Sequence, residues 1–195
     1  ESLRKGLAMG AHKAIHVKYN DAKQTDSFAY AKILQKVLEG REYDLILTGK
    51  QAQDTDAGLT APMLAEFLGL PQVTNIIRFS DVSEQNITLY RKGDHATEVL
   101  EMELPGVVTV NDSLNEPRLA SMRGIMMAKK KPLEEIELDA IGVSADMSGA
   151  QGSMTEILQF DKPESRKEGK SFEGDETETV KQAMDLLVSE AKFLA

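Results

Sequence analysis

The segment LTGKQAQDTDAGLTAP, residues 47–62, contains the strongest local arrangement of chemical groups in the sequence. It follows an apolar run and ends in a pattern typical of a helix start, with Thr60 as the expected N-cap and Pro62 in the first turn. A helix N-terminus at the carboxyl end of a strand offers free N–H groups and a positive dipole end, which favour a phosphate. Gly58 would let the backbone approach a ligand closely. The pattern therefore indicates a nucleotide site.

Two aspartates in this segment suit other contacts, because carboxylates do not bind phosphate well. Asp54 and Asp56 could accept hydrogen bonds from ribose hydroxyls, or they could hold the loop through Asx turns. The segment matches neither G-x-x-x-x-G-K-[ST] nor G-x-G-x-x-G, and an ordinary strand-to-helix connection is the alternative interpretation. The candidate nucleotide-binding residues are Gly49, Lys50, Gln51, Ala52, Gln53, Asp54, Thr55, Asp56, Ala57, Gly58, Leu59 and Thr60.

Other kinds of site have weaker support. His12, His16 and His95 have no metal-ligand spacing, and the sequence has no cysteine, which excludes disulfides and a thiolate nucleophile. There is no G-x-S-x-G motif of a hydrolase nucleophile. We therefore expect neither catalytic residues nor a metal site.

The elements around the loop alternate between strand and helix. KAIHVK (13–18) is a short strand, and Asp26 caps a helix that Gly40 closes. YDLILTG (43–49) is a continuous apolar run, as expected for a strand buried on both faces of a parallel sheet, and a helix follows at about 60–68. This order predicts a Rossmann-like, doubly wound α/β fold with a mostly parallel sheet.

The later part of the chain has a different sequence pattern. Residues 71–110 contain short strands that continue the sheet, and TEVLEMEL alternates as an antiparallel strand with one solvated face. We expect an α/β domain over 1–138, then an extended C-terminal arm and helix over 139–195 that contact a partner subunit or fold back on the domain. The helix spans 175–195, Asp175 and Glu178 form its capping box, and its apolar stripe is Val180, Ala183, Met184, Leu187, Val188, Ala191 and Leu194.

One segment, NEPRLASMRGIMMAKKK (115–131), combines cations with flexible apolar side chains. It carries two arginines and three lysines against one glutamate, although the whole chain has a net charge of -9. A surface that contacts another protein would accept both kinds of residue. The acidic chain argues against nucleic-acid binding, and the absence of an apolar run of about 18 residues argues against membrane insertion.

Three segments together resemble the β subunit of the electron transfer flavoproteins. LAMGAHKAIHV resembles a strand–helix junction of that family, and LTGKQAQDTDAGLTAP is similar to its adenine-nucleotide loop. YRKGDHATEVLEMELPGVVTVNDSLNEPR resembles its signature, with Glu98, Leu104-Pro105 and the closing Leu114-Asn115-Glu116-Pro117-Arg118, and IMMAKKKP follows as in the family. The resemblance covers nearly the whole chain. It also implies a further βαβ portion ahead of residue 1.

The resemblance implies an adenine-nucleotide α-hydrolase-like fold and a heterodimer with an α subunit that holds most of the FAD. The β subunit would bind a structural AMP and have no catalysis of its own. Flavin dehydrogenases of the acyl-CoA dehydrogenase type, as in fatty acid oxidation, would supply electrons, and a quinone reductase or another acceptor would take them. The implied location is the bacterial cytoplasm, or alternatively the mitochondrial matrix.

The segment 115–131 corresponds to the family's recognition loop, whose anchoring position, usually a leucine, falls on Met122. The lysine run would steer encounters with acidic surfaces, and packing of Met122 inside the domain is the alternative. The implied recognition residues are Arg118, Met122, Arg123, Ile125, Met126, Lys129, Lys130 and Lys131.

Several positions depart from the family pattern. Pro62 and AEFLGLPQVT look more like the branch whose β subunit holds a second FAD for electron bifurcation, but Thr55 stands where that branch has glycine, so AMP is favoured. Lys92, His95 and Ala96 occupy a turn where an acidic residue and glycines are usual, which affects the expected flavin environment. A stand-alone adenine-nucleotide-binding module is the remaining alternative.

Overall fold

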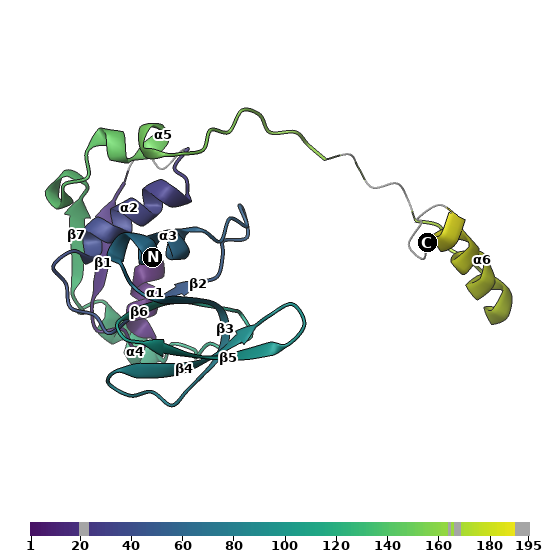
Figure 1. Cartoon of the computed structure of the whole chain (residues 1–195), viewed down its shortest axis with the longest axis horizontal. Coiled ribbons are helices and arrows are strands. Elements are labelled where there is room, and N and C mark those ends of the chain that lie inside the picture. Colours follow the sequence, from purple (N-terminus) through teal and green to yellow (C-terminus); the bar gives the residue numbers. More distant parts are fainter. Residues whose placement is uncertain (20–23, 164, 166–168, 190–195) are drawn as a thin grey trace. The chain divides into compact units, whose positions relative to one another are not determined.

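The computed structural model describes residues 1–19, 24–163, 165 and 169–189, which form six α-helices and seven strands (Figure 1). Residues Glu1–Ile157 make one compact unit and Leu158–Ala195 a second. The helices of the first unit are α1 (Ser2–Ala8), α2 (Ser27–Leu38), α3 (Thr60–Leu68), α4 (Met122–Ala128) and α5 (Gly149–Gly152), with 3-10 turns η1 (Asp139–Ile141) and η2 (Ala145–Met147). Its strands are β1 (Ala14–Lys18), β2 (Leu45–Gly49), β3 (Gln72–Ser80), β4 (Asn86–Lys92), β5 (Thr97–Glu103), β6 (Gly106–Val110) and β7 (Leu133–Glu137).

The larger sheet has the strand order β2-β6-β3-β4-β5. Its β2, β6 and β3 run parallel, with Leu45 opposite Gly106 and Val73 opposite Val108. Strands β3, β4 and β5 form an antiparallel meander on the same sheet. The predicted α/β fold is therefore confirmed. The sheet is parallel over β2, β6 and β3, as predicted, and residues 71–110 continue it as expected, but their antiparallel strands make it mixed.

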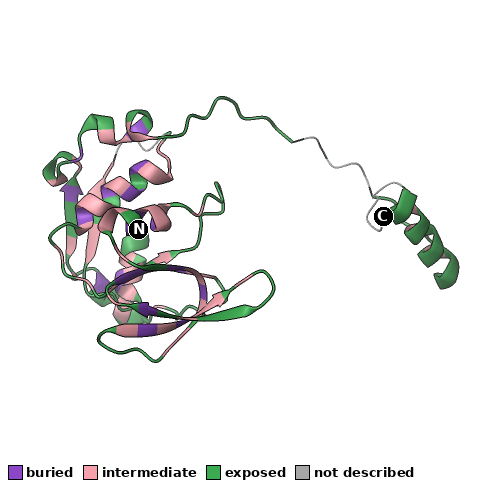
Figure 2. Cartoon of the chain, in the orientation of Figure 1, coloured by how far each residue is buried: buried purple, intermediate pink, exposed green. Residues whose placement is uncertain are grey.

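The core lies on both faces of this sheet, and Figure 2 shows the buried stretches on its strands and on α2 and α3. One cluster joins the meander to the parallel strands through Ile76, Leu89, Met102 and Val108. The alternation of β5 holds, because Met102 is buried while its neighbours Glu101 and Glu103 are exposed. Apolar residues at every second position explain why this strand presents one face to the core.

A second cluster packs α3 against the sheet. Ala61 and Ala65 of α3 contact Val107 of β6, with Ile46 of β2 partly buried beside them. Helices α2 and α3 also meet, since the rings of Phe28 and Phe67 stand edge to face with centroids 5.3 Å apart. The small side chains of Ala61 and Ala65 let α3 approach β6 closely.

The prediction that strand β2 is buried on both faces is wrong for the described part of the chain. There β2 pairs with β6 alone, and Leu47 is 55% exposed. Successive side chains of a strand point to opposite faces, so Ile46 and Thr48 face α3 while Leu47 faces the other way. An apolar run identifies a strand but does not say which of its faces is covered.

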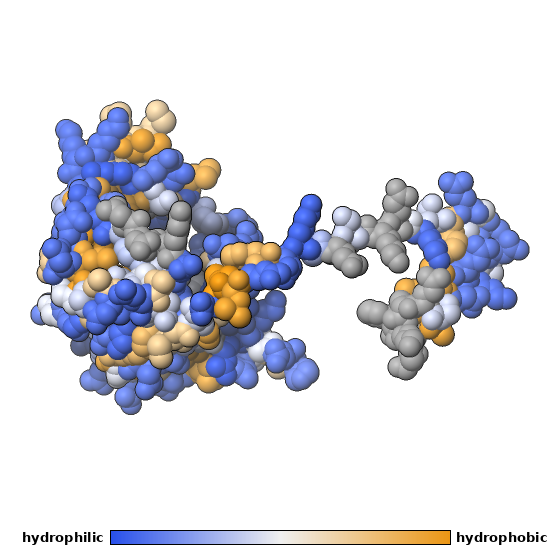
Figure 3. All heavy atoms as spheres, turned by 90° about the horizontal axis from the view of Figure 1, so that it is seen from above, coloured by the Kyte–Doolittle hydropathy of each residue, from blue (hydrophilic) through white to orange (hydrophobic). Residues whose placement is uncertain are grey.

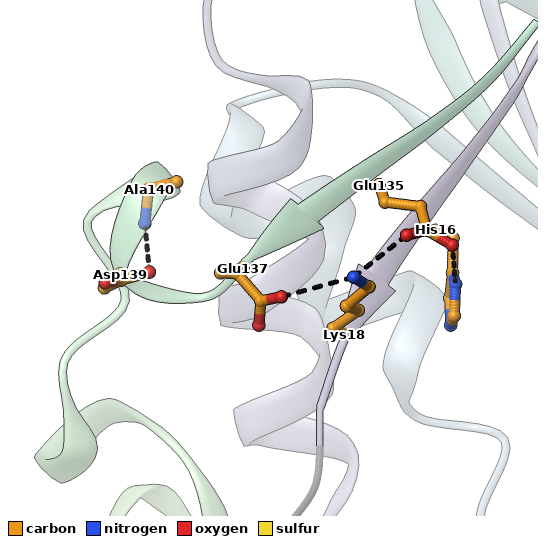
Figure 4. A network of polar contacts seen from close by, with 6 residues as sticks. All are labelled: His16, Lys18, Glu135, Glu137, Asp139 and Ala140. Carbon is orange, nitrogen blue, oxygen red and sulfur yellow. Dashed lines mark hydrogen bonds and ion pairs between the residues drawn. The ribbon is translucent and has the colours of Figure 1, made fainter.

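Strands β1 and β7 form a separate two-stranded parallel sheet within the first unit. Ion pairs cross between them, with Lys18 Nζ 2.9 Å from Glu135 Oε2 and 3.5 Å from Glu137 Oε1 (Figure 4). The ring of His16 also lies close to Glu135, with Nδ1 3.8 Å from Oε1. The hydrogen bond between Lys18 and Glu135 raises the pKa of Lys18 and lowers that of Glu135. These side chains are exposed, so the network fixes strand register more than it adds stability.

Residues 154 and 155, which lie within the segment predicted as the arm, are tied to the N-terminus of α2 by one carboxylate. Asp26 Oδ1 accepts the N–H of Ala29 at 2.9 Å, which confirms Asp26 as the N-cap of α2. Its Oδ2 accepts the N–H groups of Met154 and Thr155 and the Thr155 hydroxyl at 2.8, 3.0 and 3.0 Å. Partial burial raises the pKa of Asp26, but these hydrogen bonds outweigh it and hold the pKa below its ordinary value of 3.8.

We expect Asp26→Asn to loosen this attachment, because an asparagine side chain has one acceptor oxygen where aspartate has two, and its NH2 group only donates. Hydrogen exchange at residues 154 and 155 should become faster, whereas Asp175→Asn at the cap of the last helix should leave it unchanged. A carboxyl with a depressed pKa contributes stability above its unfolded-state pKa and loses it as pH falls through the folded-state pKa. Exchange at residues 154 and 155, corrected for its intrinsic rate, should therefore rise only below about pH 4 in the unaltered chain. Equal exchange in Asp26→Asn and the unaltered chain at neutral pH would exclude this attachment.

The described part of the second unit contains α6 (Glu176–Ser189). Asp175 Oδ1 accepts the N–H of Thr177 at 3.0 Å, so Asp175 caps the helix as predicted. The contact of Glu178 that would complete the predicted capping box does not occur among the described residues. Val180, Met184, Leu187 and Val188 are all exposed, and apolar and hydrophilic atoms both reach the surface of this helix (Figure 3). The predicted helical positions 190–195, with Ala191 and Leu194, lie outside the described residues.

Candidate functional site

The connection between β2 and α3 is held by its own hydrogen bonds. Lys50 N–H donates to Val110 O at 3.0 Å, which extends the pairing of β2 with β6 by one residue. Asp56 N–H donates to Ala52 O at 2.9 Å, and Asp56 Oδ1 accepts from Gln51 Nε2 at 2.9 Å. Asp56 thus supports the loop through a side-chain hydrogen bond with Gln51, and not through the expected Asx turn.

Gly58 has the backbone conformation that its residue type predicts. Its φ is +60°, in the left-handed region that glycine adopts without strain. A Cβ at this position would lie 3.6 Å from Lys50 O, an ordinary contact, so the requirement for glycine comes from the backbone angle and not from crowding. The turn at Gly58 brings the loop back to the start of α3.

The prediction of Thr60 as the N-cap of α3 is wrong by one residue. Leu59 occupies the cap position with no side-chain hydrogen bond, and Thr60 is the first helical residue. A leucine side chain has no acceptor to offer the first N–H groups of the helix. The positive end of α3 therefore faces the loop without a side-chain cap.

A cavity of about 350 Å³ lies between this loop, α2 and the start of α3. Eight of the predicted nucleotide-binding residues line it: Gly49, Lys50, Gln51, Ala52, Thr55, Ala57, Gly58 and Thr60. The other four do not line it: Gln53, Asp54, Asp56 and Leu59. Four lining residues escaped the sequence analysis: Ser27, Leu34, Thr48 and Ala61. Leu34 is 37% exposed although it lies on the apolar face of α2, and only the structure shows that it reaches the cavity.

Thr48 places an unused hydroxyl beside this cavity. Its Oγ1 is buried and has no hydrogen-bond partner among the described residues. A buried hydroxyl without a partner costs about 1–3 kcal/mol. By contrast Thr109, which is 2% exposed, accepts the N–H of Asn75 at 2.9 Å through its Oγ1. Thr48 therefore carries an unsatisfied hydroxyl that is shielded by the protein beside the cavity.

We expect Thr48→Val to raise the free energy of unfolding of the nucleotide-free protein by about 1 kcal/mol, because it removes an unsatisfied group at constant shape. The same change at Thr109 should lower it by about 1–3 kcal/mol, since Asn75 N–H loses its acceptor. Urea unfolding of the nucleotide-free protein measures both effects. If Thr48→Val were as destabilising as Thr109→Val, the claim that the Thr48 hydroxyl has no hydrogen-bond partner would be wrong.

The predicted recognition segment contains helix α4, which begins at Met122. Ser121 caps it, with its Oγ accepting Gly124 N–H at 3.0 Å. Leu119 is 94% exposed and Met122 is 78% exposed, so the alternative that Met122 packs inside the domain is excluded. Met126 is also exposed. These side chains form an apolar surface on the segment.

The end of the segment is fastened to α1. Lys131 Nζ donates to Leu7 O at 2.8 Å and Ala11 O at 2.7 Å. Arg4 Nη1 donates to Ala128 O at 2.6 Å and Lys131 O at 3.1 Å. The ammonium of Lys131 thus joins two segments within the fold. The exposed Lys129 and Lys130 are the cations of the run that are better placed to meet a partner.

The signature turn with the departures Lys92, His95 and Ala96 is a hairpin between β4 and β5. Gly93 N–H donates to Ala96 O at 3.1 Å, and Arg91 Nε lies 2.5 Å from Glu98 Oε2 across the strands. A Cβ on Gly93 would lie 2.8 Å from Ala96 O, so the turn requires glycine there. Lys92, His95 and Ala96 depart from the family pattern, but the turn still closes through its hydrogen bond.

Two other kinds of site receive no support. In the residues that the structure describes, no three His, Asp or Glu side chains gather as a metal site. No described helix has the length and hydrophobicity that a membrane crossing requires.

Comparison with known proteins identifies the family. The model of the electron transfer flavoprotein domain matches residues 1–141. The chain is 36% identical to the electron transfer flavoprotein subunit beta of Bacillus subtilis over 195 residues, which is all of this chain and 74% of the relative. It is 39% identical to that of Mycobacterium leprae over 162 residues, 81% of this chain and 59% of the relative.

A mitochondrial electron transfer flavoprotein subunit beta of Arabidopsis thaliana is 37% identical over 170 residues, 87% of this chain and 64% of the relative. The chain thus spans between 59% and 74% of the length of these curated relatives. The chain belongs to the electron transfer flavoprotein family, among its beta subunits.

Proposed function

We propose that this chain works as the β subunit of a heterodimeric electron transfer flavoprotein and is not itself a catalyst. Its α subunit holds most of the FAD, flavin dehydrogenases of the acyl-CoA dehydrogenase type reduce that FAD, and a quinone reductase or another acceptor reoxidises it. The observation that carries the proposal is the cavity between the loop 49–60, α2 and α3, in a chain of this family. It gives the β subunit a nucleotide site of its own.

The cavity suits the chemistry of an adenine nucleotide. The start of α3 has no side-chain cap, and together with the left-handed turn at Gly58 it offers backbone N–H groups to a phosphate. Lys50 lines the same cavity and supplies a positive charge. Ser27 adds a hydroxyl group, and Leu34 gives an apolar surface on which a base can lie.

The size of the cavity favours AMP over a second FAD. Its volume of about 350 Å³ is near the lower end of the range of about 300–1,000 Å³ for small-molecule sites. FAD contains AMP together with a complete riboflavin phosphate, which needs far more room. Thr55, which lines the cavity, also stands where the second-FAD branch has glycine.

The arm and α6 are the parts that would hold the α subunit. In the arm, Leu158 and Phe160 are 86% and 87% exposed. In α6, the stripe of Val180, Leu187 and Val188 is exposed as well. Exposed apolar side chains at this density are typical of an interaction surface. The attachment of the arm to Asp26 would hold its first residues at a fixed point of the first unit.

The recognition segment would dock the electron donors. Met122 is a flexible apolar side chain that can adapt to several pockets, and its exposure makes it available. Arg118, Arg123, Lys129 and Lys130 are exposed and positive, so they would speed encounters with acidic surfaces at low salt. The proposed dehydrogenases are therefore expected to be acidic around the site that receives Met122.

The nucleotide content of the heterodimer tests the proposal. The complex, purified from cells that make both subunits, should be yellow and release FAD and AMP in equal amounts on denaturation. Release of FAD alone, at two per heterodimer, would replace AMP with the second-FAD alternative. A complex without any nucleotide besides the FAD of the α subunit would disprove a nucleotide site in this chain.

A further inference from the structure

A groove with an apolar floor lies between α1 and α4, beside the exposed apolar surface of the recognition segment. Its volume is about 560 Å³. Ala8 of α1 forms the floor with Ala120, Ile125 and Ala128 of the segment. Three alanines leave room where larger side chains would fill the space between two helices. The floor is therefore shaped to admit an apolar side chain from outside.

The rim of this groove is mostly positive. Arg4, Lys5 and Lys129 line it together with a single carboxylate, Glu1. Lys5 Nζ lies 3.3 Å from Glu1 Oε1, but both side chains are more than two thirds exposed, so this pair is weak. Three cations against one carboxylate form a basic rim on a chain whose net charge is -9. Such a rim attracts a segment that carries carboxylates.

The two helices that make the groove are held at a fixed separation. A Cβ on Gly124 of α4 would lie 2.5 Å from Ala8 O, so glycine at this position is what lets α4 approach α1 so closely. The hydrogen bonds from Arg4 to Ala128 O and from Lys131 to Leu7 O tie the helices at further points. A groove that is already formed loses little entropy when it binds.

The groove is continuous with the surface that docking would use. Ile125 lines the groove from α4, and Ala120 lines it from the residues just before the helix. Their neighbours Leu119 and Met122 are 94% and 78% exposed. A partner that receives Met122 in a pocket of its own would therefore bring its adjoining surface over the groove.

We propose that this groove receives an apolar side chain flanked by carboxylates from the electron-donating dehydrogenase. Docking is then reciprocal, because the chain inserts Met122 into its partner and the partner inserts a side chain between α1 and α4. The cationic rim selects acidic neighbours for that side chain, and the alanine floor accommodates it. This inference rests on the proposed function and adds a second contact to it.

Two kinds of variant of the complete heterodimer test the groove. Ala120→Phe fills the floor, and Lys5→Glu reverses one rim charge at an exposed position. Lys13→Glu is the matched control, because it makes the same charge change at an exposed position that lies outside both the groove and the recognition segment. Equal FAD content and an unchanged Tm would show that each variant is assembled.

The probe is a purified acyl-CoA dehydrogenase that has been reduced with its acyl-CoA, and the readout is the rate of flavin reduction against heterodimer concentration. We expect the KM for the heterodimer to rise by about tenfold in Ala120→Phe and in the rim variant, with kcat unchanged, and to rise far less in the control. If the unaltered heterodimer is reduced but both groove variants match the control, the groove proposal is wrong while the proposed function stands. If the unaltered heterodimer is not reduced, the proposed function is wrong.

The other possible occupant of the groove is a second copy of the molecule, and self-association of the heterodimer tests it. Sedimentation over a range of concentrations compares the self-association of the unaltered heterodimer with that of the groove variants. We expect the groove variants to leave self-association unchanged. If such association is found, the groove binds a second copy of the molecule, and its assignment to the dehydrogenase is overturned. Sedimentation and flavin reduction thus decide between the two occupants.

Discussion

Met122→Ala is expected to weaken docking of the heterodimer to an acyl-CoA dehydrogenase by about 30-fold. Truncating an apolar anchor at the centre of an interface typically costs about 2 kcal/mol or more, and about 1.4 kcal/mol corresponds to tenfold. Met122 is 78% exposed at the first position of α4, so its removal takes nothing from the core. The FAD content and the Tm of the heterodimer should therefore stay the same. The measurement is the Kd for the dehydrogenase together with the rate of flavin reduction.

Val82→Ala provides the matched control for this change. Val82 is also strongly exposed, at 68%, and it lies between β3 and β4, away from the recognition segment. This variant should bind the dehydrogenase as the unaltered heterodimer does. Electron transfer rates that are the same in Met122→Ala and Val82→Ala would rule out Met122 as the anchor.

Leu187→Asp should reduce the affinity of this chain for the α subunit by a factor on the order of 100. Burying a leucine contributes about 1.5–3 kcal/mol, and a carboxylate at the same position adds a desolvation penalty. Leu187 is 43% exposed and lies in one stripe with Val180 and Met184, at helical spacing. The change leaves the first unit untouched. Sedimentation of the two subunits at falling concentration gives the affinity.

Gln182→Asp is the control for the helix variant. It introduces the same charge on the same helix, about half a turn away from Val180 and Met184. The heterodimer should keep its affinity in this variant. Unaltered affinity in Leu187→Asp would show that the stripe of α6 does not contact the α subunit.

The elements that carry strong local signals could be predicted from the sequence. Asp26 and Asp175 cap their helices as expected, because a short acidic side chain at these positions accepts N–H groups whatever surrounds it. The alternation in β5 also placed Met102 inside the core. The glycine of the loop, Gly58, adopts the left-handed conformation that suits its residue type.

The features that depend on distant parts of the chain could not be predicted in this way. The exposure of Leu47 depends on which strands flank β2, and a local apolar run contains no such information. Ser27 and Leu34 reach the cavity because α2 packs beside α3, a contact between segments far apart in sequence. Lys131 looked like one cation of a run, but the approach of α1 gives it two carbonyl partners.

The start of α3 shows how close alternatives are resolved by backbone geometry. Thr60 and Leu59 are adjacent, and residue preference alone favours threonine as the cap. The loop closes with Gly58 in the left-handed region, which leaves Leu59 at the cap position and Thr60 in the first turn of the helix. This shift of one residue leaves the helix start without a side-chain acceptor, which is the feature that a bound phosphate would use.

Anaerobic mixing of the heterodimer with a reduced acyl-CoA dehydrogenase tests the account most directly. The absorbance of the oxidised FAD should bleach on mixing, and the rate should saturate with dehydrogenase concentration and fall as salt is added, because exposed cations of the recognition segment assist the encounter. A heterodimer that carries its FAD and nucleotide but whose flavin stays oxidised with every dehydrogenase of this class would contradict the proposed role of the chain.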